Sequence, residues 1–271
     1  MDPIEVAIDA ARLAGAHALR RFRTPMAKRL KGPADLVTEA DSEAEELIVR
    51  SIRRAFPDHA FLGEEGHQPR PEAEYTWVID PIDGTRNYVR GIPFFCTSLA
   101  LTRRGVPVVA VIFDPVHQET FHAQQGRGAY LDGTPVRVNR EAALQDGVLA
   151  LSLVSERYRH NGHVALPMLG QLQPMVESVR LMGSAALHLA YLACGRCELV
   201  FQDSVHPWDI LAGALLVQEA GGVATELQGT PVSISSHDII AASNRAIHDM
   251  GRAVAQKAIV ARGDRRSGPA W

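Results

Sequence analysis

The chain has few cysteines, few aromatic residues and little net charge. Its 271 residues include 3 cysteines and 6% aromatic residues, and the formal net charge is -3. So few cysteines in a chain of this length exclude the disulfide framework that holds small secreted domains together. The near-neutral balance argues against a dedicated nucleic-acid-binding protein, which would carry an excess of basic residues.

Long apolar runs are also absent. The longest clean runs, such as Val106–Phe113, are far shorter than the roughly 18 residues that a membrane-spanning helix needs. The first residues do not have the pattern of a signal peptide, because Asp2, Glu5 and Asp9 interrupt the apolar positions. We therefore expect a cytoplasmic protein with no membrane contact.

Hydrophobic residues make up 46% of the chain, which is enough for a substantial core. A folded chain of this size buries roughly 70–75% of the surface of its unfolded form. The pattern of elements changes near residue 140. We therefore predict an N-terminal α+β lobe over residues 1–140 and a C-terminal α/β lobe over residues 141–271.

The first lobe begins with two predicted helices. Apolar residues recur at helical spacing between Pro3 and Pro25, and again from Thr38 to about Phe56. Thr38 and Asp41 have the spacing of a capping box. Short β-branched runs separated by turn residues then predict an antiparallel meander, with strands at 76–80, 98–102, 106–114, 119–123, 129–131 and 136–138.

In the second lobe, helices and strands are interspersed. We predict strands at 148–152, 199–201, 223–226 and 239–242, and helices at 163–173, 184–194, 207–220 and 245–260. Ser184 can cap the second of these helices, and Pro207 suits the first turn of the third. The residues from Arg262 onwards are polar, which predicts a frayed tail.

Acidic residues stand at several predicted strand and helix ends: Asp41, Glu64, Glu65, Asp80, Asp83 and Asp209. In the run Asp80–Thr85, Pro81 fixes the backbone and Gly84 permits a tight turn, so the two aspartates can point into one site. The Ile82 carbonyl offers a further oxygen. Converging carboxylates repel and raise each other's pKa, a conflict that a hard divalent cation such as Mg²⁺ removes. The alternative is that each acid merely caps a helix or decorates a turn.

Several motifs carry a family resemblance. The run Trp77–Thr85 resembles the first signature of the inositol monophosphatase family, and Trp208–Gly213 resembles the second. Gly63-Glu64-Glu65 and Asp35–Asp41 are similar to its other acidic elements. Order and separation also fit, and the similarity covers roughly residues 5–260. It implies a layered αβαβα fold of the α/β (α+β) class and Mg²⁺-dependent hydrolysis of a small phosphate monoester.

The resemblance also implies roles for individual residues, with two or three Mg²⁺ ions in the site. Glu64, Asp80 and the Ile82 carbonyl would hold the first ion, and Asp80, Asp83 and Asp209 the second. A third, weaker ion would lie near Glu64. Thr85 with Glu64 or Asp41 would orient and activate the attacking water. Backbone N–H groups of Gly84 and Thr85 would cradle the phosphate. The substrate-facing set is Asp83, Gly84, Thr85, Arg180, Gly183, Ser184, Gln202 and Asp209.

Two positions concern the substrate. Inositol phosphatases carry a glutamate where this chain has Gln202, which keeps hydrogen-bonding ability but loses the charge. Arg86 resembles the arginine of histidinol-phosphatase-like members, although a surface arginine is the simpler interpretation. Inositol 1-phosphate is the default substrate, with histidinol phosphate, fructose 1,6-bisphosphate, 3′-phosphoadenosine 5′-phosphate and NADP as alternatives.

A hypothesis of a different class is a regulatory protein that contacts the transcription machinery, as some bacterial members do. The resemblance further implies a homodimer and lithium sensitivity. Lys31 is similar to a metal-loop lysine of the family, and His206 lies near the second motif. A redox or zinc role is the less favoured interpretation of Cys194-x-x-Cys197, because no partner motif is nearby. A metal role is also the less favoured interpretation of His160-x-x-His163, which lies in a predicted polar loop.

Overall fold

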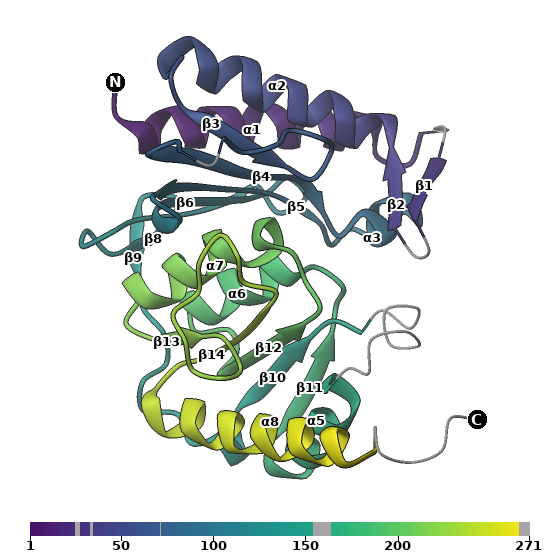
Figure 1. Cartoon of the computed structure of the whole chain (residues 1–271), viewed down its shortest axis with the longest axis vertical. Helices are drawn as coiled ribbons and strands as arrows, with labels where there is room; N and C mark the ends of the chain where they lie inside the picture. Colours follow the sequence, from purple (N-terminus) through teal and green to yellow (C-terminus); the bar gives the residue numbers. More distant parts are fainter. Residues whose placement is uncertain (25–27, 33–34, 71, 154–163, 266–271) are drawn as a thin grey trace.

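Helical and sheet layers alternate in the molecule (Figure 1). The computed structural model describes residues 1–24, 28–32, 35–70, 72–153 and 164–265. The outer layer is α1 (Pro3–Arg21) and α2 (Glu39–Ala55), the middle layer is α6 (Ala185–Ala193) and α7 (Pro207–Glu219), and the far layer is α5 (Ala165–Leu172) and α8 (Arg245–Arg265). One sheet lies between each pair of helical layers, so the predicted αβαβα architecture is confirmed.

The first sheet has 7 strands, in chain order from β3 to β9. They are β3 (Ala60–Gly63), β4 (Tyr75–Asp83), β5 (Cys96–Arg103), β6 (Val106–Asp114), β7 (Glu119–Gln124), β8 (Ala129–Leu131) and β9 (Thr134–Val136). β3 pairs parallel with β4, and the other pairs are antiparallel. The meander is confirmed. The sequence prediction missed β3, which is too short for a clear alternation, and placed β9 too late.

The second sheet has 5 strands in the order β11-β10-β12-β14-β13. They are β10 (Val148–Leu151), β11 (Ser178–Leu181), β12 (Leu199–Asp203), β13 (Val223–Thr225) and β14 (Asp238–Ala242). The prediction missed β11, an edge strand with no buried residue to reveal it. The remaining elements are β1 (Lys28–Gly32), β2 (Asp35–Thr38), α3 (Thr85–Val89), and the 3₁₀ turns η1 (Leu144–Asp146) and η2 (Gln173–Met175).

Helix ends follow the predicted capping chemistry. Asp41 Oδ2 accepts from the Thr38 backbone N–H at 2.8 Å, and Ser184 Oγ accepts from the Leu187 N–H at 3.3 Å. The predicted end of the last helix at Val260 is wrong, because α8 continues to Arg265. A single glycine there, Gly263, costs a helix only about 1 kcal/mol and does not stop it.

The middle layer brings distant parts of the chain together. α7 packs against β4, β5 and β6 on one side, against β13 and β14 on the other, and against α6 within its own layer. The two helices approach closely at Gly213, where an added Cβ would collide with the side chain of Leu189. This packing presents the start of α7, with Asp209, to the end of β4.

Three residues named in the sequence analysis are not fully described: His160 and His163 lie outside the described residues, and so does the side chain of Lys31. Among the helices of the described part, none is long and apolar enough to cross a membrane.

Candidate active site

The end of β4 carries two of the acidic residues. Asp80 pairs with Ser98 of β5 and Asp83 pairs with Cys96, with a register irregularity between them. Asp80 Oδ1 accepts from the Ile82 backbone N–H at 3.0 Å, which fixes the turn. Both aspartates are buried. The strand therefore ends in a local kink that holds two carboxylates inside the protein.

The third carboxylate comes from α7. Asp209 lies in the first turn of this helix, and its Oδ2 accepts from the His206 backbone N–H at 2.7 Å. One ligand oxygen from each of Asp80, Asp83 and Asp209 lies within 4.8 Å of the others. The structure thus brings together acidic residues from the two predicted lobes.

These carboxylates disturb each other's ionisation. Burial raises the pKa of Asp80 well above its usual value, and the charges of Glu64, Asp83 and Asp209 raise it further. Glu64, just beyond β3, also shares a hydrogen bond with Asp80. Burial, followed by the charge of Asp209, raises the pKa of Asp83 to about 7. A divalent cation would remove this repulsion, so the donor set fits a hard metal ion with oxygen ligands.

The start of α6 holds Asp83. Asp83 Oδ2 accepts from Ser184 Oγ at 2.5 Å and from the Ala186 backbone N–H at 2.7 Å. These bonds favour the charged form and so lower the pKa of Asp83 against the effect of burial. The Ser184 hydroxyl, which we expected to face substrate, donates to a carboxylate of the cluster, and its own contact with substrate stays a prediction.

Thr85 and Asp41 lie beside the carboxylate cluster. Thr85 Oγ1 is 2.9 Å from the Ile82 carbonyl oxygen and 3.3 Å from Asp41 Oδ1. The other Asp41 oxygen accepts from the Thr38 backbone and hydroxyl. Because a carbonyl oxygen has two lone pairs, Ile82 can accept from Thr85 and still offer a ligand.

The turn that carries Glu64 and Glu65 is organised by a residue that the sequence analysis missed. Glu45 of α2 is 2% exposed. It accepts from the Glu65 backbone N–H at 2.8 Å and its other oxygen is 2.6 Å from His67 Nδ1. A signal was available, because Glu45 lies on the same helical face as the buried Ile48 and Ile52.

Gln202 lies at the end of β12 and is 1% exposed. Its Oε1 accepts from the Ser152 backbone N–H at 3.0 Å, and its Nε2 is 3.0 Å from His188 Nδ1. Burial lowers the pKa of His188 to about 3, so this histidine is neutral and accepts from the Gln202 amide. The sequence analysis missed His188, whose signal was a polar residue within the apolar run of α6.

The other expected substrate contacts are placed as follows. Arg180 lies exposed on the edge strand β11, and its guanidinium donates to the Val179 carbonyl oxygen at 3.1 Å. Gly183 has a φ of 85° in the turn before α6. Arg86 is exposed in α3. His206 stacks on Trp208, with 4.5 Å between ring centroids.

Cys194 and Cys197 lack the environment of reactive thiols. Cys194 and Cys197 are free thiols, and burial raises the pKa of both. A reactive cysteine needs the opposite shift, toward the thiolate. The structure therefore supports the less reactive interpretation of the C-x-x-C sequence.

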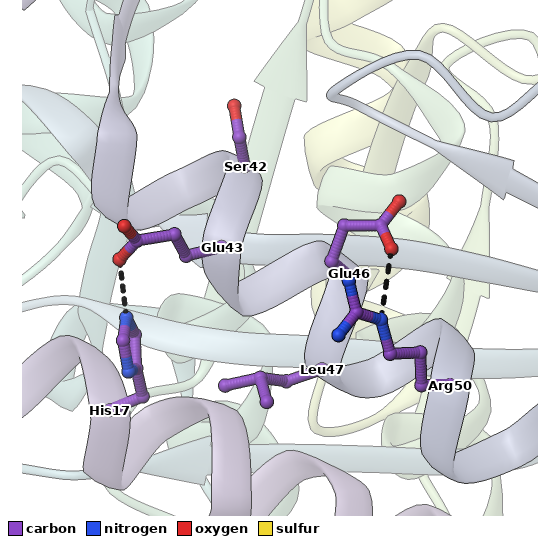
Figure 2. A pocket seen from close by; sticks show the side chains of 6 residues that line it. All are labelled: His17, Ser42, Glu43, Glu46, Leu47 and Arg50. Atoms are coloured by element: carbon purple, nitrogen blue, oxygen red, sulfur yellow. Dashed lines mark hydrogen bonds and ion pairs between the residues drawn. The ribbon is translucent and has the colours of Figure 1, made fainter.

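A hollow of about 410 Å³ lies between α1 and α2 (Figure 2). Two pairs of its lining side chains interact, with His17 Nε2 2.8 Å from Glu43 Oε2 and Arg50 Nε 3.3 Å from Glu46 Oε2. Exposed pairs of this kind contribute about 0–1 kcal/mol each. The carboxylates of the hollow, Glu43 and Glu46, are not buried, whereas Asp80 and Asp83 are, so the cluster is the stronger candidate for chemistry.

Comparisons with known proteins agree on one family. A family model described as the inositol monophosphatase family matches residues 2–259. The chain is 40% identical over 228 residues to a Nus factor SuhB of Xylella fastidiosa, covering 83% of this chain and 82% of that protein. It is 37% identical over 241 residues to inositol monophosphatase 1 of Solanum lycopersicum, covering 87% and 88%. An IMPase structure from Thermotoga maritima superposes with a TM-score of 0.88 at 32% identity, covering 97% of this chain and 100% of that one.

Proposed function

The chain belongs to the inositol monophosphatase family and is a phosphoric monoester hydrolase, and we propose that it hydrolyses a small polyol phosphate with Mg²⁺, inositol 1-phosphate first among the candidates. The observation that carries this proposal is the meeting of Asp80, Asp83 and Asp209 within 4.8 Å. Phosphate monoesters hydrolyse extremely slowly without a catalyst, and side-chain acid–base catalysis supplies only about 10²–10⁴-fold.

The residues that would hold the ions are those of the cluster. Glu64, Asp80 and the Ile82 carbonyl would form one site, and Asp80, Asp83 and Asp209 another, with Asp80 shared. Bound Mg²⁺ would lower the pKa of water, neutralise phosphate charge and stabilise the leaving oxygen. The mutual repulsion that raises the pKa of Asp80 supports this assignment, because a cation stabilises the ionised carboxylates.

The chain's own groups would position the water and the phosphate. The Thr85 hydroxyl can donate to Asp41 Oδ1 while its lone pair accepts a hydrogen bond from the attacking water. As the water oxygen attacks phosphorus, the water proton would pass to the Thr85 oxygen while the Thr85 proton passes to the Asp41 carboxylate. Glu64 is the other candidate base, since it lies beside Asp80. The backbone N–H groups of Gly84 and Thr85, at the start of α3, would donate to the phosphate.

We infer the substrate class from Gln202, Ser184 and Arg180, the side chains expected to face the substrate. The alternatives to inositol 1-phosphate are histidinol phosphate, fructose 1,6-bisphosphate, 3′-phosphoadenosine 5′-phosphate and NADP. The Gln202 carbonyl oxygen already accepts one backbone N–H, so it has one remaining lone pair for a substrate hydroxyl. A small neutral polyol suits such a group better than a strongly charged one.

The experiment is phosphate release from this panel, with Mg²⁺ and with EDTA, using the Asp80→Asn protein as a control for contaminating phosphatases. We expect Mg²⁺-dependent release with at least about a tenfold preference for one substrate, which corresponds to roughly 1.4 kcal/mol. Absence of release from every substrate, with folded protein and saturating Mg²⁺, would contradict the proposal.

A second candidate function follows from the relative named Nus factor SuhB, which suggests a regulatory role in transcription. Binding to purified RNA polymerase, measured with and without substrate, distinguishes this role from hydrolysis alone. We also expect a homodimer and inhibition by Li⁺, as the family resemblance implies. Sedimentation and Li⁺ titration of phosphate release test these two points.

A further inference from the structure

The side-chain amide of Asn87 bridges two distant segments of the chain. Asn87 lies in α3, and its Nδ2 donates to the carbonyl oxygen of Phe94 at 2.8 Å and to that of Met182 at 2.6 Å. An amide NH₂ group has two protons, so both are used. Phe94 belongs to the loop before β5, and Met182 belongs to the loop before α6.

Both bridged loops lie tightly against the turn at Gly84. This glycine has a φ of 94°, and a Cβ on it would lie 3.0 Å from the Phe94 carbonyl oxygen and 3.4 Å from that of Gly183. A Cβ on Gly183 would lie 3.1 Å from Asn87 Nδ2. The three segments are therefore packed with little space between them, and the loops depend on the two Asn87 hydrogen bonds for their position against this turn.

Both segments that Asn87 bridges continue to residues that contact Asp83. Beyond Met182, Ser184 Oγ and the Ala186 N–H both donate to Asp83 Oδ2. Beyond Phe94, Cys96 is the ladder partner of Asp83, and its Sγ is 3.8 Å from Asp83 Oδ2. The amide of Asn87 thus fixes the relative position of two segments that meet at one carboxylate.

We propose that Asn87 is a positioning residue for the hydrolysis. Its amide holds the two loops that orient Asp83, and so sets where the other Asp83 oxygen points. Asn87 acts through these loops and not on the substrate. The kinetic part of the inference rests on the proposed function, whereas the effect on metal binding does not.

The test variant is Asn87→Asp, which keeps nearly the same shape but loses both donors. Asn244 offers a matched control, because its Nδ2 also bridges two backbone carbonyls, those of Arg140 and Ala142, at 3.0 Å each. In Asn244→Asp the cap of α8 survives, since the bond from the Ile247 N–H goes to the retained Oδ1. Asn87→Ala and Asn244→Ala repeat the comparison without adding a charge.

Two readouts are measured for each protein. The first is the Mg²⁺ concentration that gives half of the full Mg²⁺-induced rise in melting temperature, and the second is kcat and KM for the preferred phosphate monoester. We expect both Asn87 variants to raise the Mg²⁺ midpoint about tenfold and to lower kcat by roughly 10–100-fold, because small displacements of catalytic groups have effects of this size. The Asn244 variants should stay within about twofold of the wild type.

A role limited to stability would lower the melting temperature and leave the Mg²⁺ midpoint and kcat unchanged, and that result would overturn the proposal. Equal losses in the Asn87 and Asn244 variants would overturn it as well. If Asn87→Asp does not fold, Asn87→Ala is judged by the same two readouts. If the wild type releases no phosphate, the proposed function fails, while the Mg²⁺ midpoint still decides the role of Asn87.

Discussion

Two buried polar clusters contact α6, and they differ in charge. The acidic cluster is Asp80, Asp83 and Asp209, and it meets the helix where Ser184 donates to Asp83. The neutral cluster is His188, Gln202 and the Ser152 backbone, and it meets the helix one turn later. Burial raises the pKa of Asp80 and Asp83 and lowers the pKa of His188, so for these three groups it favours the neutral form.

The two clusters differ in what stabilises them. The acidic cluster is destabilised by its own charges, and a bound cation relieves that repulsion. In the neutral cluster, most side-chain nitrogen and oxygen atoms have a hydrogen-bond partner inside the protein. Among the described side chains of His188 and Gln202, the atom without a partner is His188 Nε2. We therefore expect changes in the first to affect catalysis and changes in the second to affect stability.

The largest expected effect comes from Asp80→Asn. Asp80 is the carboxylate shared between both proposed metal sites, so its neutralisation should lower kcat/KM at least about 10³-fold, or roughly 4 kcal/mol of transition-state stabilisation. Phosphate release at saturating Mg²⁺ measures this loss.

The same variant has an opposite effect on the metal-free protein. Burial and the neighbouring carboxylates disfavour the charged form of Asp80, and a neutral asparagine avoids that cost, so in EDTA Asp80→Asn should melt at the same temperature as the wild type or higher. A lower melting temperature in EDTA would contradict the view that the acidic cluster is destabilising without a cation.

A smaller loss is expected from Thr85→Ala. Thr85 contacts Ile82 and Asp41 through its hydroxyl, and its proposed part is to orient water, so kcat should fall about 10²-fold with a small change in KM. Thr85→Ser keeps the hydroxyl and serves as the control. Equal losses from Asp80→Asn and Thr85→Ala would refute the ranking of metal ligand above water-orienting group.

The parts of the site that sequence could predict are those encoded over short distances. The run from Asp80 to Thr85 shows its two aspartates, its proline and its glycine within one turn, so their convergence follows from local geometry. Asp209 was assigned only through the family resemblance, since its approach depends on how α7 packs between the sheets.

The contacts that escaped prediction join residues far apart in the chain. Periodicity shows that Glu45 and His188 face the core, but it does not show which partner meets them there. Asn87 gives no periodic signal at all, because its role is defined by two carbonyl groups in separate loops. β11 was missed for a related reason, since an edge strand has no buried face to produce alternation.

The neutral cluster should make the unfolding free energy fall at acidic pH, because of His188. The pKa of His188 is about 3 in the folded protein and near 6.5 in the unfolded chain, so the unfolded state binds the proton first as pH falls. Its contribution to stability is complete above pH 6.5 and is lost as pH falls toward 3. Between pH 6.5 and 4.5, the wild type should lose about 2–3 kcal/mol more unfolding free energy than His188→Gln.

Urea unfolding of both proteins across this range measures the difference. Above pH 7 the two stability curves should run parallel, because His188 is neutral in both states there. Equal slopes below pH 6.5 would mean that His188 gains its proton without unfolding, and that the neutral cluster can hold a charge.

The smallest expected effect is that of Gln202→Glu, which tests whether a member of the neutral cluster also contacts the substrate. A carboxylate accepts from substrate hydroxyls more strongly than an amide oxygen that already accepts the Ser152 N–H. If Gln202 reaches the substrate, the kcat/KM ratio of inositol 1-phosphate to fructose 1,6-bisphosphate should rise about threefold to tenfold. The Mg²⁺ midpoint is the control and should not move. A lower melting temperature with an unchanged ratio would assign Gln202 to the support of α6 alone, and substrate choice would then depend on residues nearer the acidic cluster.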